Sequence, residues 1–161
     1  MARIRILIGS HLCTNTRALR EARALVEAGH EVTIQGAWYD KTLIARDESM
    51  LRKQPFHFEP VVDLQHRGLL ARLRRRLGVE SWRRFKRFRP ASLGYGIREH
   101  LRTARAAEAD LTIAHSEGTM WVAAQLAARG LRVGIDFENW FSEIIRPEER
   151  AQRPVEALRA L

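Results

Sequence analysis

Side chains that could bind or transform a ligand occur in three short segments, each directly after a run of apolar residues. The first segment contains Ser10, Thr14, Asn15 and Arg17. Hydroxyl, amide and guanidinium groups at the start of a helix can hold an anion or ligand hydroxyls, together with the free N–H groups of the helix. Alternatively, Thr14 and Asn15 would only cap the helix, and Arg17 would be solvated. The sequence leaves both interpretations open.

The second segment contains His115, Ser116 and Glu117, and the third contains Asp136, Glu138 and Asn139. A histidine at the end of a strand can donate a hydrogen bond to a phosphate or a hydroxyl, and it can also exchange a proton near neutral pH. We therefore take His115 as the candidate catalytic residue and the other five as candidate binding residues. The alternative is that His115 is an ordinary loop residue and that Asn139 only caps a helix.

Several well-known kinds of site are missing from these segments. Residues 9–14 read GSHLCT, without the glycine fingerprint of a dinucleotide-binding loop or the lysine of a P-loop. One cysteine and six histidines show no metal-ligand spacing, so we predict no metal site and no cofactor. Cys13 has no partner for an internal disulfide, which fits a reducing cytoplasm. No apolar run reaches the length of about eighteen residues that a membrane span needs.

The three segments can meet only if the apolar runs before them are neighbouring strands. Arg3–Gly9 is rich in β-branched residues, which predicts a buried strand. Apolar residues at helical spacing follow between Thr16 and Gly29, and a second strand is predicted at 31–36. A strand, a helix and a strand within about 35 residues predict a parallel βαβ unit with a right-handed crossover.

A second unit of the same kind is predicted near the end of the chain. Strands at 111–114 and 132–136 flank an alanine-rich helix at 118–129. An amphipathic helix through Ile97 and Leu101 precedes them. Together the two units predict an α/β fold, a doubly wound, Rossmann-like parallel sheet with helices on both faces.

Ligands of such sheets bind beyond the carboxyl ends of the strands, near the point where the strand order reverses. We therefore expect His115, Ser10, Asn15 and Glu138 to line one cleft at that edge.

The middle of the chain has weaker patterns. Residues 38–53 are polar, and we predict a loop there with at most a short helix. A third strand is predicted at 56–64. Pro60 restricts it to the edge of the sheet or to a bulge, because proline donates no backbone hydrogen bond.

The net charge of +9 is concentrated in one insert at about residues 66–90. Residues 67–89 contain nine arginines and one lysine against Glu80 alone, so the rest of the chain is neutral. Two amphipathic pieces are predicted on either side of Gly78. The apolar side chains are Leu69, Leu70, Leu73 and Leu77 in the first piece and Trp82, Phe85 and Phe88 in the second.

An apolar stripe among arginines is typical of a helix that lies on an anionic membrane surface. The residues assigned to this surface are Arg72, Arg74, Arg75, Arg76, Trp82, Arg83, Arg84, Phe85, Lys86 and Arg87. The alternative is that the stripe packs on the domain's own core and that the arginines are merely solvated.

Four passages resemble, in the correct order, those of family 4 glycosyltransferases, which have the two-domain GT-B fold. RALREA at 17–22 resembles R-V-x-R-E-A at the start of the first helix of that family. VEAGHEVT at 26–33 resembles L-x-x-x-G-H-E-V-T, which leads into the second strand. ADLTIAH at 109–115 resembles A-D-V-I-H-A-H, and IDFENWFSE at 135–143 resembles Y-D-A-H-E-x-F-S-E. These passages cover most of the chain outside residues 38–90.

The resemblance implies a retaining, metal-independent glycosyltransferase that transfers a sugar from a nucleotide-diphosphate sugar to an acceptor. A lipid-linked acceptor or a cell-envelope polysaccharide would fit. Residues 1–161 would be the single N-terminal, acceptor-side domain, truncated before a C-terminal donor-binding domain with an E-x7-E motif. That domain would lie in the full protein or in a separate chain, and this chain alone would be inactive.

The resemblance also gives the candidate residues their roles. The histidine that matches His115 reaches into the cleft near the transferred sugar, and the other candidates would contact the acceptor or the donor. Two departures affect these acceptor contacts. The glycine pair common in the first loop of the family is missing, and Glu138 or Asn139 replaces the His-Glu of the last motif.

The alternative function is a basic Rossmann-like module that binds nucleic acid or an anionic membrane surface without catalysis. Arginines interleaved with aromatic residues also occur in nucleic-acid binders. The neutral remainder of the chain and the lack of a known nucleic-acid-binding motif disfavour that partner. An oxidoreductase is disfavoured by the missing glycine fingerprint. The expected location is the cytoplasm, with peripheral binding to the inner face of the membrane.

Overall fold

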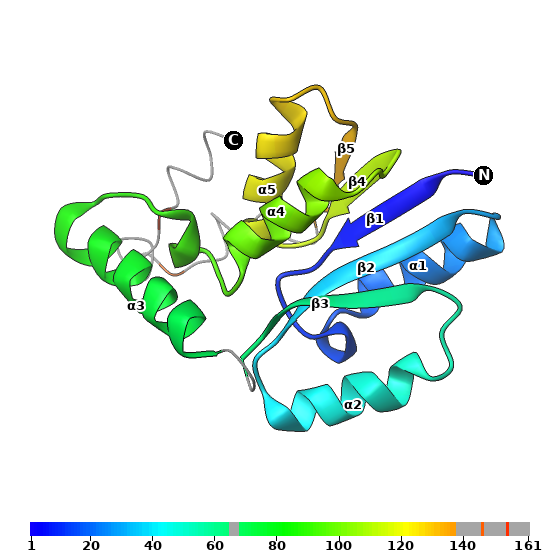
Figure 1. The fold of residues 1–161 in the computed structure, drawn as a ribbon, viewed down its shortest axis with the longest axis horizontal. Coiled ribbons are helices and arrows are strands. Elements are labelled where there is room, and N and C mark those ends of the chain that lie inside the picture. Colours follow the sequence, from blue (N-terminus) through cyan, green and yellow to red (C-terminus); the bar gives the residue numbers. More distant parts are fainter. Residues whose placement is uncertain (65–67, 138–145, 147–153, 155–161) are drawn as a thin grey trace.

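The computed structural model of this 161-residue chain describes residues 1–64, 68–137, 146 and 154. Within these residues, five parallel strands form one sheet in the order β3-β2-β1-β4-β5 (Figure 1). The strands are β1 (Arg3–Leu7), β2 (Glu31–Trp38), β3 (His57–Asp63), β4 (Leu111–Ala114) and β5 (Val133–Ile135). The α/β, Rossmann-like fold predicted from the sequence is confirmed. The strand order reverses between β1 and β4.

Helices cover both faces of the sheet. The helices α1 (Thr16–Glu27) and α2 (Lys41–Leu51) lie on one face, and α4 (Ile97–Ala106) and α5 (Glu117–Ala127) lie on the other (Figure 1). Two short 3-10 helices are η1 (Leu12–Thr14) and η2 (Pro90–Ser92). The helix α3 (Gly68–Phe85) stands apart from these layers and packs on η2 (Figure 1).

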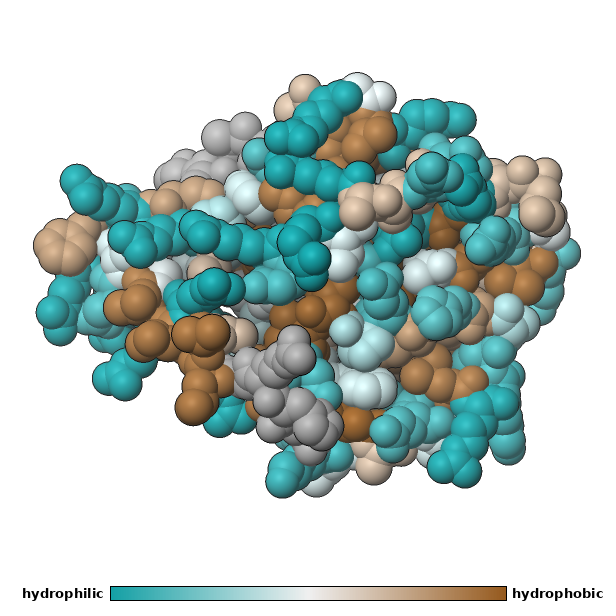
Figure 2. Space-filling view, viewed as in Figure 1, coloured by the Kyte–Doolittle hydropathy of each residue, from teal (hydrophilic) through white to brown (hydrophobic). Residues whose placement is uncertain are grey.

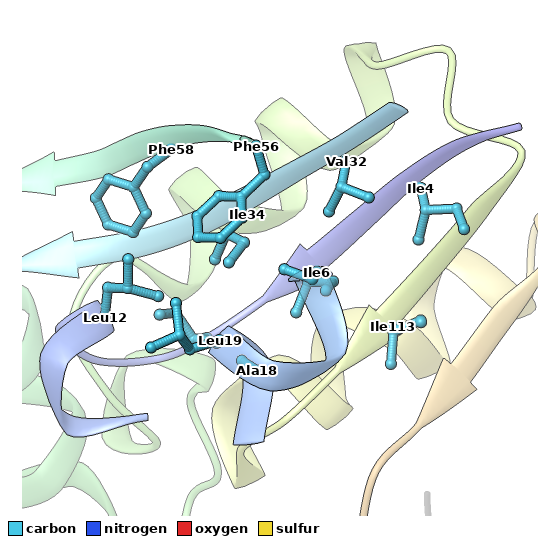
Figure 3. Packing of buried hydrophobic residues seen from close by; sticks show 12 residues of the cluster. Ile4, Ile6, Leu12, Ala18, Leu19, Val32, Ile34, Phe56, Phe58 and Ile113 are labelled. Carbon is cyan, nitrogen blue, oxygen red and sulfur yellow. The ribbon is translucent and has the colours of Figure 1, made fainter. Parts of the chain in front are cut away.

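The strands bury alternate side chains on opposite faces, as the pleat of a strand requires. Ile6 of β1 and Ile113 of β4 pack with Leu19 of α1 (Figure 3). Leu7, the next residue of β1, packs on the other face with α4 and α5. His115 comes two residues after Ile113, so its side chain belongs to the α1 face of the sheet.

The two predictions for the middle of the chain have different outcomes. β3 lies at the edge of the sheet, and its register with β2 shifts between Gly36 and Ala37, so the restriction expected from Pro60 is confirmed. Most of residues 38–53 is not a loop, because α2 is a helix of 11 residues, longer than the short helix that the sequence prediction allowed. The side chain of Asp40 caps α2 by accepting a hydrogen bond from the backbone N–H of Thr42 at 2.8 Å.

The helix α3 is continuous, whereas a break at Gly78 was predicted. A Cβ atom at Gly78 would lie 2.8 Å from the backbone nitrogen of Ser92 and 3.0 Å from the carbonyl carbon of Ala91. Glycine is therefore present at this position for close packing on η2, and it does not interrupt the helix. No helix in the described part of the chain is long and apolar enough to cross a membrane.

Candidate functional site

The loops after β1 and β4 meet at the carboxyl edge of the sheet, where the strand order reverses. The backbone N–H of His115 donates to the carbonyl of Leu7 at 3.0 Å. A Cβ atom at Gly9 would lie only 2.7 Å from Oγ of Ser116, so glycine lets the two loops touch. The predicted binding segments are therefore neighbours at the place where ligands bind such sheets.

His115 lies between two carboxylates. Its Nε2 is 2.5 Å from Oε2 of Glu21 on α1, and its Nδ1 is 3.2 Å from Oδ2 of Asp136, directly after β5. The backbone N–H of Asp136 donates to the carbonyl of Ala114 at 2.9 Å, which fixes Asp136 beside His115. The contact of Nε2 with Glu21 has hydrogen-bond geometry, whereas Nδ1 and Asp136 are within ion-pair distance.

Arg17 closes this cluster from the solvent side. Its Nε donates to Oδ2 of Asp136 at 2.9 Å, and its Nη2 donates to Oδ1 of the same carboxylate, a bidentate pair. The side chain of His115 is only 3% exposed, whereas those of Arg17 and Asp136 are 44% and 23% exposed. A ligand can therefore reach the imidazole only after one of the side chains around it moves.

The four side chains Arg17, Glu21, His115 and Asp136 are hereafter the His115 cluster. The cluster can hold and transfer a proton between an imidazole and two carboxylates. Its guanidinium can bind an anionic group if Asp136 releases it. Glu21 was not among the residues predicted for the site. The only sequence signal for it is the passage at 17–22, which was interpreted as the start of a helix.

The other candidates in the first loop have mainly structural roles. Oδ1 of Asn15 accepts from the backbone N–H of Ala18 at 3.1 Å and caps α1. Oγ1 of Thr14 donates to the carbonyl of His11 at 2.8 Å, and Ser10 lies within 3.4 Å of the Thr14 hydroxyl. The capping alternative therefore describes Asn15 correctly, whereas Thr14 bonds to the carbonyl of His11 and does not cap α1. Arg17 differs from that alternative, because it is paired and not merely solvated.

Ser116 caps α5 in the same way. Its Oγ accepts from the backbone N–H of Thr119 at 3.5 Å, and the Thr119 hydroxyl accepts from the backbone N–H of Ser116 at 3.0 Å. This reciprocal capping box holds the loop after β4 rigid. Glu117 is half-buried in the first turn of α5. Glu138 and Asn139 lie outside the described residues. The cleft predicted for His115, Ser10, Asn15 and Glu138 is therefore described only for the first three of these residues.

A second polar cluster lies beside the loop after β1, and its central residues, Asp47 and His11, are fully buried. Asp47 of α2 accepts hydrogen bonds from Nδ1 of His11, from Nε1 of Trp38 and from two backbone N–H groups, at 2.7–3.3 Å. Nε2 of His11 accepts from the backbone N–H groups of Tyr39 and Asp40, both at 3.1 Å. These contacts put the proton of His11 on Nδ1 and use all of its hydrogen-bonding capacity. His11 is therefore a structural residue.

Cys13 is adjacent to this buried cluster. Burial, and after it the neighbouring Asp47, together raise the pKa of the Cys13 thiol to about 11. A thiol with such a pKa is a poor nucleophile at neutral pH. Within the described residues, no group of three or more histidine, cysteine, aspartate or glutamate side chains is placed to hold a metal ion.

A hollow of about 380 Å³ opens at the same edge of the sheet, beside the end of β3. Its lining residues are Val61, Val62, Asp63, Leu70, Ala71, Arg74 and Glu99. The floor is apolar, and an ion pair between Arg74 and Glu99, 3.0 Å apart, crosses its rim. The hollow lies two strands away from β1 and is formed by β3, α3 and α4.

The predicted membrane-surface residues lie on α3 and directly after it. Arg72, Arg74, Arg75, Arg76, Arg83, Arg84, Phe85, Lys86 and Arg87 are exposed, and Trp82 is half-buried. Several of the charges are paired, as in the contact of Arg84 with Glu80 at 2.5 Å. Among the described residues, no ion-pair partner accompanies Arg72, Arg76 or Arg87.

Comparison with known proteins gives similarity in fold only. No family model matches the sequence, and no curated protein matches it significantly. Among solved structures, the glycosyltransferase VinC in complex with dTDP has a TM-score of 0.53 at 13% identity, over 98% of this chain and 43% of VinC.

Two further solved structures are similar at lower scores. SsfS6, a glycosyltransferase of Streptomyces sp. SF2575, has a TM-score of 0.46 at 16% identity, over 84% of this chain and 39% of SsfS6. The C-terminal domain of the hydrogenase PF1911 of Pyrococcus furiosus has a TM-score of 0.47 at 16% identity, over 84% of this chain and 91% of that domain. This chain thus spans less than half of either glycosyltransferase. Membership of family 4 stays a prediction.

Proposed function

We propose that this chain is the acceptor-side domain of a glycosyltransferase that uses a nucleotide-diphosphate sugar. The observation that carries the proposal is the His115 cluster, because it lies at the carboxyl edge of a Rossmann-like sheet where the strand order reverses. The similarity in fold to VinC, which was solved with dTDP, supports it.

In the proposed reaction the bond between the anomeric carbon of the donor sugar and the diphosphate breaks. A bond forms between that carbon and an acceptor oxygen, and the acceptor proton leaves with the nucleoside diphosphate. Once Asp136 moves aside, Nδ1 of His115 would donate a hydrogen bond to the transferred sugar, while Glu21 would stay on Nε2, orient the ring and balance its charge. Following the resemblance in sequence, the reaction would be metal-independent and would retain the anomeric configuration.

The acceptor would be lipid-linked or a polysaccharide of the cell envelope, and the protein would act peripherally at the inner face of the membrane. An apolar floor and a charged rim in the hollow beside β3 suit an amphipathic acceptor. The hollow opens at the same edge of the sheet as the His115 cluster.

The test is transfer by the full-length gene product, supplied with UDP-, GDP- and dTDP-linked hexoses and a membrane lipid extract. Release of nucleoside diphosphate should depend on the extract. His115→Gln should lower the rate at least about tenfold if the imidazole acts in the transition state. His57→Gln is the matched control, because His57 is exposed at the start of β3. Full activity of His115→Gln, or no release with any donor, would contradict the proposal.

One observation favours the non-catalytic alternative. The leucines of α3 face solvent, which a module that only binds an anionic membrane surface would also require. Such a module would bind anionic vesicles but release no nucleoside diphosphate with any donor. The transfer assay above therefore separates the two functions.

A further inference from the structure

Five large apolar side chains of α3 point into solvent. Leu69 is 85% exposed, Leu70 65%, Leu73 53%, Leu77 52% and Phe85 70%. Figure 2 shows hydrophobic side chains gathered on the part of the molecule where Figure 1 draws α3. We name these five residues the α3 apolar face. None of these five side chains belongs to the hydrophobic core of the domain. A contiguous exposed apolar patch of this kind marks an interaction surface.

Most charges of α3 lie beside this face, whereas Glu80 and Arg84, whose side chains pair at 2.5 Å, fall within the arc of the leucines. At about 100° of rotation per residue, the four leucines fall within an arc of about 100°. On the same wheel Arg72, Arg76 and Arg83 fall on the flank next to Leu69 and Leu73. All three are exposed, so the helix presents aliphatic side chains with a row of guanidinium groups along one border. The aromatic stripe expected from Trp82 is not part of the face, because Trp82 is half-buried.

Contacts on the other side of α3 prevent the helix from turning its leucines inward. The Gly78 backbone packs closely on η2. The guanidinium of Arg75 lies 4.5 Å from the centre of the Tyr95 ring and donates to its hydroxyl at 3.2 Å. Arg74 pairs with Glu99 at 3.0 Å. Rotation of the helix would break all three contacts, so these contacts hold the α3 apolar face away from the other described residues.

We propose that α3 docks flat on an anionic lipid surface. In this arrangement the leucines enter the boundary between headgroups and acyl chains, and Arg72, Arg76 and Arg83 contact lipid phosphates. At about 100° per residue, the leucines and these three arginines together occupy a sector of about 160° of the helix, so all of them can face one plane. The proposal depends on α3 alone and stands whether or not the chain takes part in glycosyl transfer.

The composition of the face favours a lipid surface over the other occupants. Nucleic acid would need aromatic groups for base stacking, and the face is mainly aliphatic. A second copy of the chain would bring one row of arginines against another unless the copies were offset. An anionic leaflet satisfies the leucines and the arginines together, because it offers acyl chains directly below phosphate groups.

The experiment is co-sedimentation of the chain with vesicles of phosphatidylcholine alone and with 30% phosphatidylglycerol, at low and high salt. Binding should require the anionic lipid. It should weaken with salt but not vanish, because salt screens the charges and not the leucines. Leu73→Asp with Leu77→Asp should lower binding roughly tenfold or more. Arg72→Gln with Arg76→Gln should lower it about fivefold per arginine.

Matched controls are available on other parts of the domain. Leu131→Asp places the same change at an apolar residue that is 43% exposed near β5. Arg102→Gln with Arg105→Gln removes two exposed arginines of α4. Neither control should change vesicle binding, and thermal melting should show that all variants are folded. Three results would overturn the proposal: no binding to anionic vesicles, equal binding to neutral ones, or a solution dimer that Leu73→Asp dissociates.

Discussion

Nε2 of His115 lies 2.5 Å from Oε2 of Glu21, a residue 94 positions earlier in the chain. The contact joins the end of β4 to the second turn of α1. His115 also faces Asp136, so two carboxylates from separate elements fix the orientation of one imidazole ring. A change at Glu21 should therefore affect both the packing of α1 and the chemistry available to His115.

Glu21→Ala should lower the free energy of unfolding by about 1–2 kcal/mol, because it removes a charge-assisted hydrogen bond to a buried imidazole. Glu21→Gln should cost less, since an amide oxygen can still accept from Nε2. Urea denaturation measures both. Glu27→Ala is the control, because Glu27 is exposed on the same helix. Equal losses for Glu21→Ala and Glu27→Ala would show that the contact with His115 contributes nothing.

A second prediction concerns Asp47, whose buried carboxylate accepts four hydrogen bonds. Asp47→Ala leaves all four donors without their acceptor and should cost about 3 kcal/mol or more. Asp47→Asn keeps one acceptor oxygen and should cost less. Chemical denaturation measures the free energy of unfolding of each variant. Glu48→Ala is the control, because Glu48 is an exposed neighbour of Asp47 on α2. If Asp47→Ala had a free energy of unfolding close to that of Glu48→Ala, the predicted role of the buried carboxylate would be contradicted.

The same residue explains why α2 was predicted as a loop. Ile44 and Asp47 are the buried residues of this helix, so a charged residue occupies a position where an amphipathic pattern needs an apolar one. The donors that stabilise Asp47 come from η1, its preceding histidine and β2, which are distant in sequence. A sequence pattern cannot show that they converge.

The strands were predictable for the opposite reason. Runs such as Arg3–Leu7 and Leu111–Ala114 carry their signal locally, in β-branched residues bounded by glycine or polar residues. His115 and Asp136 follow strands of one parallel sheet, so their position at one edge could be inferred. Glu21 could not be assigned to the site, because its contact depends on how α1 packs across β4.

A third prediction tests why Gly78 occurs inside α3. Helix propensity alone favours alanine over glycine by about 1 kcal/mol. A Cβ atom at Gly78 would nevertheless lie 2.8 Å and 3.0 Å from backbone atoms of Ser92 and Ala91, which cannot move easily. Gly78→Ala should therefore lower the melting temperature.

Gly94→Ala is the control for this variant, because its Cβ would meet only the side chain of Ile97, at 3.5 Å. That distance is an ordinary van der Waals contact, so the melting temperature should stay the same or rise slightly. A higher melting temperature for Gly78→Ala would mean that α3 moves away from η2 without cost.

The last prediction concerns His100 on α4, which is fully buried against the sheet. Neither ring nitrogen has a hydrogen-bond partner among the described residues. Burial lowers the pKa of His100 from the usual 6.5 to about 4, against the smaller, opposite effect of the charge of Glu59 on β3. In the folded state the imidazole is therefore neutral down to about pH 4.

Between the two pKa values, the unfolded chain binds a proton at His100 that the folded chain does not bind. Acid therefore favours the unfolded state, and the stability present above pH 6.5 falls as the pH drops toward 4, by up to about 3 kcal/mol. His100→Phe keeps a ring of similar shape and removes this linkage. Denaturation from pH 7 to pH 4 should show that the free energy of unfolding of His100→Phe, relative to that of the unmodified chain, grows as the pH falls. A pH-independent difference for His100→Phe would mean that His100 takes up its proton without unfolding.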